Sequence, residues 1–134
     1  MADVIAFTRG EHNFPHFEAR DDSYSAIGSM LTSDVQYVEI WCLRILAWIE
    51  DVSAGRSTRE SWEGNSWSAE LTAKGLHLQD HFSDDWQGDY ALAEAHDIVL
   101  KYLTFLAPGP GQKETAIAEW EAETGRSHPC RGHI

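Results

Sequence analysis

The sequence predicts an α+β fold in a single domain: a two-layer sandwich in which an antiparallel sheet with a central β-hairpin is packed by two long helices and a short C-terminal helix. Three observations predict it. Residues 66–82 alternate between apolar and polar side chains, as strands with one buried face do. Residues 34–52 and 90–106 repeat apolar side chains with helical spacing. The 134 residues are 43% hydrophobic and 11% aromatic, which indicates one folded core rather than disorder.

The N-terminal segment is expected to supply one strand and a long irregular connection. Residues 4–8 are rich in β-forming side chains and predict a strand. Residues 9–30 carry Gly10, Asn13, Pro15 and Gly28, which favour a loop with room for a short helix. The sequence leaves open whether this loop covers the exposed face of the sheet.

The first long helix is predicted over residues 34–52, with Ser33 as its N-cap and Asp34 at the positive end of its dipole. Its main apolar stripe consists of Val35, Val38, Cys42, Ile45, Leu46, Ile49 and Val52. Ile40, Leu43 and Ala47 lie on the opposite side. A helix that is apolar on two sides is either covered twice or offers one side to a partner.

The clearest local pattern is a β-hairpin formed by residues 66–72 and 76–82, with a turn between them. One face is expected to bury Trp67, Ala69, Leu71, Leu76, Leu78 and in addition Phe82. The other face carries only polar side chains, including Glu70 and His77, and is expected to be solvated.

Two further helices are predicted near the C-terminus, over residues 90–106 and 112–124. The Pro-Gly-Pro-Gly run at 108–111 separates them, and Gly125 ends the second helix. The second helix should turn Ala116, Ile117 and Trp120 inward. We therefore expect a domain spanning residues 1–125 and a loosely ordered tail over residues 126–134.

Charge excludes several classes of function. The chain has 22 acidic and 10 basic residues, a formal net charge of −12. Nucleic acids and anionic membranes should therefore repel it, whereas a basic protein should attract it. The first nine residues include Asp3 and lack the basic n-region of a secretory signal peptide. No apolar run is long enough to span a bilayer, so we expect a cytoplasmic protein. Its two cysteines do not form a disulfide framework.

The negative charge is concentrated in residues 60–100. That segment holds nine acidic residues against one base, Lys74, a net charge of −8. It also contains Trp86, which is flanked only by polar residues, and acids around an aromatic anchor are typical of a surface that binds a basic protein. The expected contact residues are Glu63, Glu70, Asp80, Asp84, Asp85, Trp86 and Asp89.

The sequence offers no recognisable catalytic motif. His77 and His81 would lie about 13 Å apart along one strand, too far to share an ion. The tail supplies His128, Cys130 and His133, whereas structural zinc sites use four ligands. We therefore expect no enzyme, no bound metal and no cofactor.

Several short motifs resemble a family. They are IEDVSAG at 49–55, WEGNSW at 62–67, the alternating hairpin, an acidic loop and a helix that ends in YLTFL at 102–106. Over residues 45–106 the chain resembles small bacterial immunity proteins of contact-dependent growth inhibition and other polymorphic toxin systems. The resemblance implies a stoichiometric inhibitor of a cognate toxin, often a nuclease. It implies no catalytic residues and transfers no contact position, because contacts in these proteins diverge with the toxin.

The first hypothesis is thus an immunity protein that occludes the active site or substrate groove of a basic toxin domain. An alternative is an acidic adaptor or regulatory domain that pairs through Ile40, Leu43 and Ala47 or through the open sheet face, with homodimerisation left open. A third is a metal-dependent enzyme that uses His77, His81 and paired aspartates. The sequence names neither the toxin nor its mode of binding.

Overall fold

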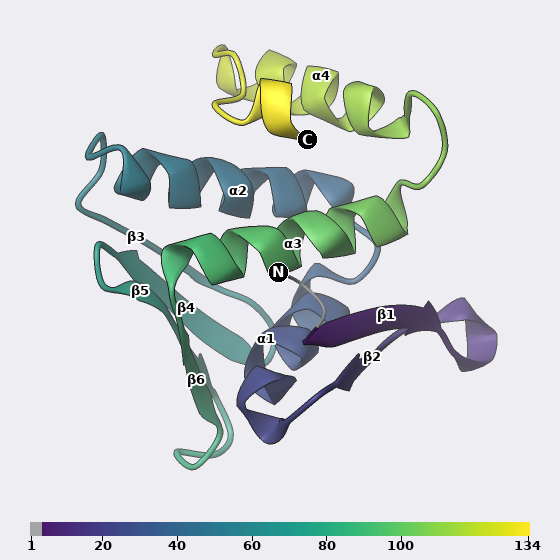
Figure 1. Cartoon of the computed structure of the whole chain (residues 1–134), viewed down its shortest axis with the longest axis vertical. Coiled ribbons are helices and arrows are strands. Elements are labelled where there is room, and N and C mark those ends of the chain that lie inside the picture. Colours follow the sequence, from purple (N-terminus) through teal and green to yellow (C-terminus); the bar gives the residue numbers. More distant parts are fainter. Residues whose placement is uncertain (1–3) are drawn as a thin grey trace.

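The computed structural model describes residues 4–134 and confirms an α+β fold. Two antiparallel sheets are present. The first is a hairpin of β1 (Ile5–Arg9) and β2 (Pro15–Ala19). The second has four strands in the order β3-β4-β5-β6 (Figure 1), namely Arg59–Glu63, Trp67–Thr72, Gly75–Asp80 and Gln87–Tyr90.

The helices form a layer on one face of the larger sheet, with a further helix beyond it. α2 (Glu39–Ser53) and α3 (Leu92–Leu106) lie side by side over the sheet, and the short α1 (Ser25–Met30) packs near β5 and β6. α4 (Gln112–Thr124) lies on the far side of α2 (Figure 1). Over residues 4–134 no helix is both long and apolar enough to cross a bilayer.

The predicted hairpin is confirmed as β4 and β5. Ala69 pairs with Leu78 and Leu71 with Leu76, and these side chains are buried. Alternate residues of both strands face outward, onto the solvated side of the sheet. Phe82 does not share the buried face, contrary to the prediction. It lies beyond the end of β5 and is 81% exposed.

Three strands were not predicted from the sequence. β2 starts at Pro15 inside the segment expected to be a loop, and the same segment holds the short helix α1 for which the sequence leaves room. β3 and β6 flank the hairpin, and each has fewer buried residues than the central strands. Trp62 of β3 stacks on Trp48 of α2, with ring centroids 5.3 Å apart. Strands at sheet edges need little apolar patterning, which explains why the sequence does not reveal them.

The first long helix starts at Glu39, five residues later than predicted. Gln36 adopts φ 56° and ψ −118°, a conformation that interrupts the helix. Asp34 therefore does not lie at the start of α2, which corrects the prediction. Its carboxylate accepts hydrogen bonds of 3.0 Å from the backbone N–H groups of Ser66 and Trp67. Asp34 thus ties the chain before α2 to the start of β4.

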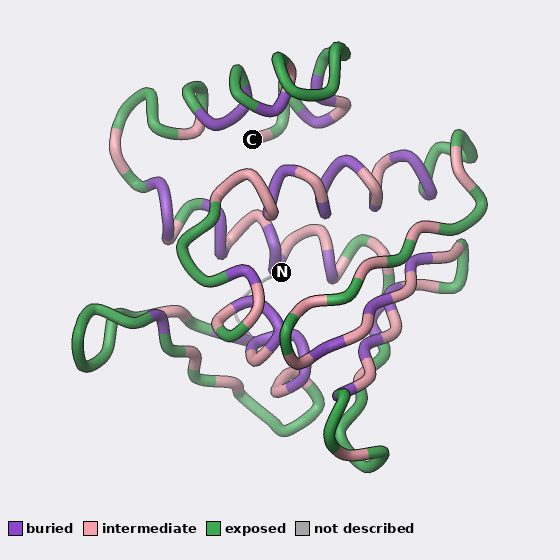
Figure 2. Tube along the Cα trace, turned by 180° about the vertical axis from the view of Figure 1, so that it is seen from behind, coloured by how far each residue is buried: buried purple, intermediate pink, exposed green. Residues whose placement is uncertain are grey.

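The second apolar side of α2 is covered. Leu43 and Ala47 are 0% and 2% exposed, and the buried residues of α4 lie on the side that faces α2 (Figure 2). Of the three residues predicted on this side, Ile40 alone is partly exposed. This side of α2 is therefore not available to a partner as the adaptor hypothesis requires, because its apolar side chains already pack within the chain.

The C-terminal segment is packed rather than loosely ordered, which corrects the predicted tail. His128 and Cys130 are 3% and 2% exposed. The Nε2 atom of His128 lies 2.8 Å from the carbonyl oxygen of Leu43, and the backbone N–H of Cys130 donates to Nδ1 of His128 at 3.0 Å. Arg126 donates two hydrogen bonds to Asp51 of α2. These specific polar contacts hold a segment whose composition is typical of a flexible tail.

Candidate protein-binding surface

The seven residues expected to contact a partner fall into three groups. Asp84, Asp85 and Trp86 lie in the loop between β5 and β6 (residues 81–86, hereafter the β5–β6 loop). Glu63, Glu70 and Asp89 lie on the solvated face of the four-stranded sheet. Asp80 alone is buried, with 7% of its surface exposed. Six of the seven residues are thus partly or fully exposed, three on the sheet face and three in the loop that follows β5.

Strand register places the sheet-face residues in rows. Ser61, Glu70, His77 and Asp89 form one row that crosses all four strands. Glu63, Ser68, Gln79 and Gln87 form the next row. All eight side chains are partly or fully exposed. The face therefore presents a polar surface whose positions are set by a rigid backbone ladder.

The acids on this face already have neighbours. Nδ1 of His77 lies 2.8 Å from the Asp89 carboxylate, and Glu70 forms an ion pair with Arg59. Glu63 accepts a hydrogen bond of 3.0 Å from a serine hydroxyl on β4. These contacts orient the carboxylates and offset part of their charge. The carboxylates of this face are thus held in position, and the face is less negative than its acids alone indicate.

Asp80 has a different role from the one predicted. Its Oδ1 accepts hydrogen bonds from the backbone N–H groups of Phe82 (2.7 Å) and Ser83 (3.0 Å). Such an Asx-type turn fixes the start of the β5–β6 loop. Asp80 is therefore a residue that shapes the loop, and it does not belong to the exposed contact set.

The β5–β6 loop exposes two aromatic rings. Phe82 is 81% exposed and Trp86 is 64% exposed. The loop backbone is nevertheless well fixed. The backbone N–H of Asp80 donates to the Trp86 carbonyl at 2.9 Å, and Nε2 of Gln79 donates to the Ser83 carbonyl at 3.0 Å. Large aromatic side chains held in solvent by an ordered loop are typical of protein-binding anchors.

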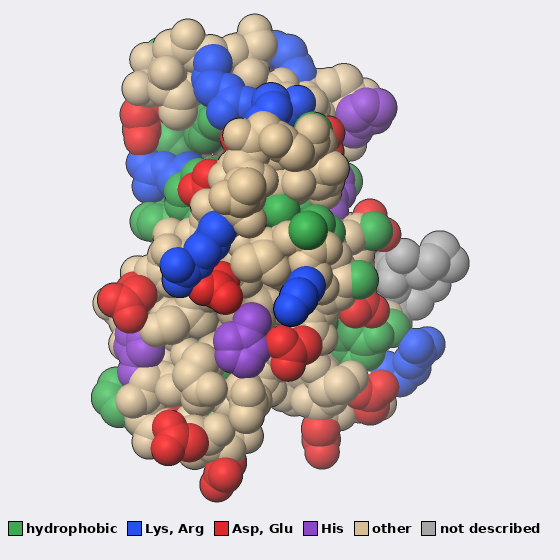
Figure 3. Space-filling model, turned by 90° about the vertical axis from the view of Figure 1, so that its left-hand side faces the viewer, with side chains coloured by type: hydrophobic (Ala, Val, Ile, Leu, Met, Phe, Trp, Pro, Cys, Tyr) green, Lys and Arg blue, Asp and Glu red, His purple; other side chains and the backbone are tan. Residues whose placement is uncertain are grey.

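Asp84 and Asp85 supply the uncompensated charge. Among residues 4–134 neither carboxylate forms an ion pair, and both residues are exposed. In Figure 3 the lowest part of the visible face, where the β5–β6 loop lies, carries acidic side chains and no Lys or Arg. Four arginines instead pair with acids of α2 and α4, namely Arg44, Arg56, Arg126 and Arg131. The charge of the molecule is thus unevenly distributed between its two ends.

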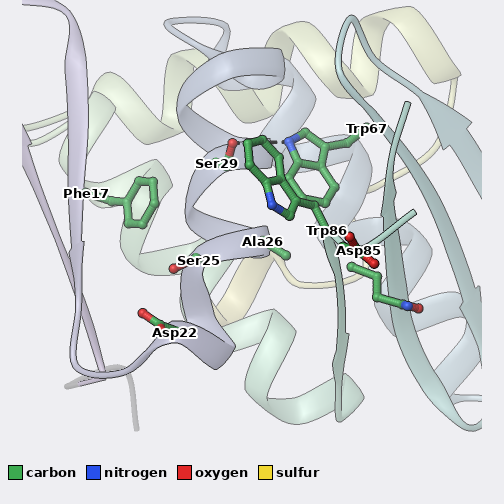
Figure 4. Close-up of a pocket in the computed structure, with 9 residues that line it drawn as sticks. Phe17, Asp22, Ser25, Ala26, Ser29, Trp67, Asp85 and Trp86 are labelled. Atoms are coloured by element: carbon green, nitrogen blue, oxygen red, sulfur yellow. Dashed lines mark hydrogen bonds between the residues drawn. The ribbon is translucent and has the colours of Figure 1, made fainter. Parts of the chain in front are cut away.

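A cleft adjoins the loop. It has a volume of about 480 Å³ and is lined by residues of β2, η2 (Asp22–Tyr24), α1, β4, β6 and the loop (Figure 4). Sequence reasoning does not identify most of this lining, namely Phe17, Asp22, Ser25, Ala26 and Ser29, because it assigns residues 9–30 to a loop. In that segment the sequence shows only the adjacent pair Asp21 and Asp22, and paired acids of this kind are usually solvated.

Histidine and cysteine side chains are the candidate metal ligands and nucleophiles of this chain. Within the described part of the chain, no three His, Cys, Asp or Glu residues are grouped to hold a metal ion. His77 faces Asp89, whereas Nε2 of His81 lies 2.9 Å from a serine hydroxyl, so the two histidines do not converge. Burial raises the pKa of Cys42 far above its ordinary value and that of Cys130 to about 11. Both thiols are therefore protonated at neutral pH and poor nucleophiles.

No family model matches the chain, and comparisons with curated proteins and with solved structures give no significant match. The functional argument therefore depends on the geometry of the surface.

Proposed function

We propose that this protein binds a basic surface of a partner protein through the β5–β6 loop and the solvated sheet face, and that it acts as an immunity protein against a cognate toxin domain such as a nuclease. One observation carries the proposal. The β5–β6 loop holds two exposed aromatic rings, Phe82 and Trp86, beside the carboxylates of Asp84 and Asp85, which form no ion pair with residues 4–134.

The chemistry of the loop fits a basic partner in two ways. Carboxylates on a protruding loop attract a cationic surface over several ångströms and accelerate the first encounter. The aromatic rings then supply apolar area that is removed from water on contact, which sustains the complex after encounter. Glu63, Glu70 and Asp89 extend the same charge along the sheet, where existing hydrogen bonds and ion pairs hold their carboxylates in place.

An acidic surface of this kind is suited to neutralise a nuclease. A nuclease site is cationic because it holds phosphate groups, so an acidic, structured loop can occupy the space that the nucleic acid needs. The resemblance over residues 45–106 points to the same class of protein. That segment includes β3, the β4–β5 hairpin, the β5–β6 loop and α3.

Co-expression with the product of the adjacent gene tests the proposal. The neighbour should be toxic when expressed alone and harmless in the presence of this protein. The double variant Asp84→Lys/Asp85→Lys should slow association at low salt and have less effect at high salt, because salt screens exposed charges. A matched control reverses Glu119, which is exposed on α4 at the other end of the molecule. A neighbour that is harmless alone, or that stays toxic in the presence of this protein, contradicts the proposal.

For the adaptor alternative the open sheet face remains available, and the structure adds a second, apolar surface that the sequence does not predict. Phe14, Tyr37 and Val38 are 54%, 39% and 46% exposed, and the rings of Phe14 and Tyr37 lie 6.2 Å apart. Apolar side chains gathered in this way favour association. Light scattering distinguishes the two functions, because a stable homodimer whose assembly is abolished by Val38→Asp favours the adaptor, whereas a monomer favours the immunity proposal.

A further inference from the structure

The cleft beside the β5–β6 loop has the features of a site for one particular side chain. We propose that it receives an arginine side chain of the partner protein, which stacks between aromatic rings and pairs with carboxylates at the rim. This inference deepens the proposed function and rests on it for the identity of the partner. The cleft itself is tested separately below.

The walls of the cleft are aromatic and come from distant parts of the chain. Phe17 projects from β2 on one side and Trp86 from the β5–β6 loop on the other, with Trp67 of β4 behind Trp86 (Figure 4). Trp67 is fixed, because its indole N–H donates to the Ser29 hydroxyl at 3.2 Å. A guanidinium group is attracted to the face of an aromatic ring, and most strongly to that of tryptophan.

The position of Phe17 depends on a glycine. A Cβ atom on Gly28 would lie 2.5 Å from the Phe17 ring, so only glycine lets this ring rest against α1. On the opposite side a Cβ on Gly88 would lie 2.8 Å from the Cβ of Ala26, so β6 also approaches α1 closely. The Phe17 side and the β6 side of the cleft are therefore both packed closely against α1, so the cleft is present in the free protein.

The rim of the cleft is acidic. Asp22 and Asp85 line it from opposite sides (Figure 4), and no Lys or Arg is among the residues of the described chain that line it. Neither carboxylate forms an ion pair with residues 4–134. An uncharged apolar occupant would remove water from these carboxylates and offer no hydrogen bond in its place, which is unfavourable. The occupant should therefore carry positive charge.

The combination of rings and carboxylates favours arginine over lysine. The guanidinium group is planar, so it can stack on a ring while its N–H groups donate to carboxylates in the plane. The ammonium group of lysine is more strongly hydrated and cannot stack in this way. The cleft volume of about 480 Å³ lies in the range of binding sites for small molecules and leaves room for the backbone around the arginine.

A peptide titration tests the cleft without any partner. The probe is the blocked tripeptide acetyl-Gly-Arg-Gly-amide. One control replaces arginine with citrulline, which has the same shape but no charge, and a second replaces it with lysine. Amide and indole ¹H–¹⁵N signals of the full chain report the site. We expect the arginine peptide to shift the indole signals of Trp67 and Trp86 and the amide of Ser25 saturably, and the citrulline and lysine peptides to bind several-fold more weakly.

Matched variants locate the effect. Trp86→Ala should weaken binding of the arginine peptide by about threefold or more, whereas Phe82→Ala, on the same loop but outside the cleft, should not. Asp85→Asn should weaken it more than Asp84→Asn, because only Asp85 lines the cleft. Each variant removes an exposed group and keeps the loop hydrogen bonds, and an unchanged circular dichroism spectrum verifies the fold.

The outcomes separate the two proposals. Absence of shifts, equal shifts with the citrulline peptide, or shifts centred on the sheet face would overturn the arginine site. If the peptide fails to bind and the adjacent gene's toxin is still neutralised, only the arginine site is wrong. If the peptide binds in the cleft and no toxin is neutralised, the immunity function is wrong and the arginine-binding cleft stands.

Discussion

Asp51 joins α2 to the C-terminal segment, and removal of its charge should loosen that junction. Its side chain is only 11% exposed. Arg126 donates to both carboxylate oxygens, at 2.9 and 3.0 Å, and Nε of Arg56 donates to Oδ1 at 3.0 Å. The substitution Asp51→Asn keeps the shape of the side chain but removes the charge and one acceptor, so it isolates the electrostatic contribution.

The expected loss follows from these contacts. A hydrogen bond to a charged group contributes about 1.5–3 kcal/mol net when it is shielded from water. The side chains of Arg126 and Arg56 are 45% and 51% exposed, so solvent weakens each interaction. The asparagine amide oxygen would still accept a hydrogen bond from an arginine. We therefore expect Asp51→Asn to lower the free energy of unfolding by about 1–2 kcal/mol at pH 7.

The pH dependence provides the decisive assay. Hydrogen bonds from Arg126 are the main cause that lowers the pKa of Asp51, against the opposing effect of burial. The ionised carboxylate therefore stabilises the fold above the unfolded-state pKa of about 3.9, and this contribution is lost as the pH falls through the lower folded-state value. Urea unfolding followed by circular dichroism should show a difference between wild type and Asp51→Asn at pH 7 that shrinks in acid.

A different ion pair of α2, the one that it forms with α4, serves as the control. Arg44 pairs with Glu123, whose side chain is 48% exposed. Glu123→Gln should change the free energy of unfolding by less than about 0.5 kcal/mol. Equal effects of Glu123→Gln and Asp51→Asn, or an Asp51→Asn effect that persists undiminished in acid, would refute the reasoning.

Three further predictions concern packing and protonation. Burial lowers the pKa of His128, so stability should fall as the pH drops below its unfolded-state pKa of about 6.5, and His128→Asn should reduce this slope between about pH 7.5 and 5.5 in urea unfolding. Gly28→Ala should lower the melting temperature, because the new Cβ would force the Phe17 ring away. Gly132→Ala should leave it unchanged, because no atom lies within 4 Å of the new Cβ. Equal melting temperatures of the two variants would contradict the close contact between Gly28 and Phe17. Cys42 and Cys130 should react with a thiol reagent only after unfolding, and rapid labelling of both in the native protein would show that they are accessible.

Local patterns are sufficient to predict the elements whose side chains follow a regular periodicity. The β4–β5 hairpin, α3 and α4 lie close to their predicted bounds, and Ala116, Ile117 and Trp120 are buried as expected. A two-residue period or a 3.6-residue period is visible within a single segment, and no knowledge of the rest of the chain is needed to recognise it.

Other elements depend on partners that lie far away in the sequence. The Asp34 carboxylate binds backbone N–H groups at the start of β4 rather than the first turn of α2, so it does not mark the start of that helix. The segment at 126–134 is ordered because His128 meets the Leu43 carbonyl and Arg126 meets Asp51. Helix capping and tail flexibility are inferred from neighbours in the sequence, which cannot include these contacts.

The candidate surface likewise has features that can be predicted from the sequence and others that depend on contacts between distant residues. Accumulation of acids in residues 60–100 can be counted from the sequence, and the exposure of Asp84, Asp85 and Trp86 agrees with it. A count of acids cannot distinguish the buried Asp80 from the exposed Asp84 and Asp85, because the role of Asp80 depends on the backbone turn that it closes. The cleft cannot be predicted at all, since its aromatic walls become neighbours only when β2, α1 and the larger sheet meet.

The distribution of paired charges matters more for recognition than the net charge of −12. Around α2 and α4, arginines offset many of the acids, as in the pair of Asp51 with Arg126. At the opposite end, Asp84 and Asp85 have no such partners among the described residues. A cationic protein would therefore be drawn to one end of the molecule and oriented before contact. The aromatic loop and the cleft lie at that end, so steering and anchoring would act on the same part of the partner.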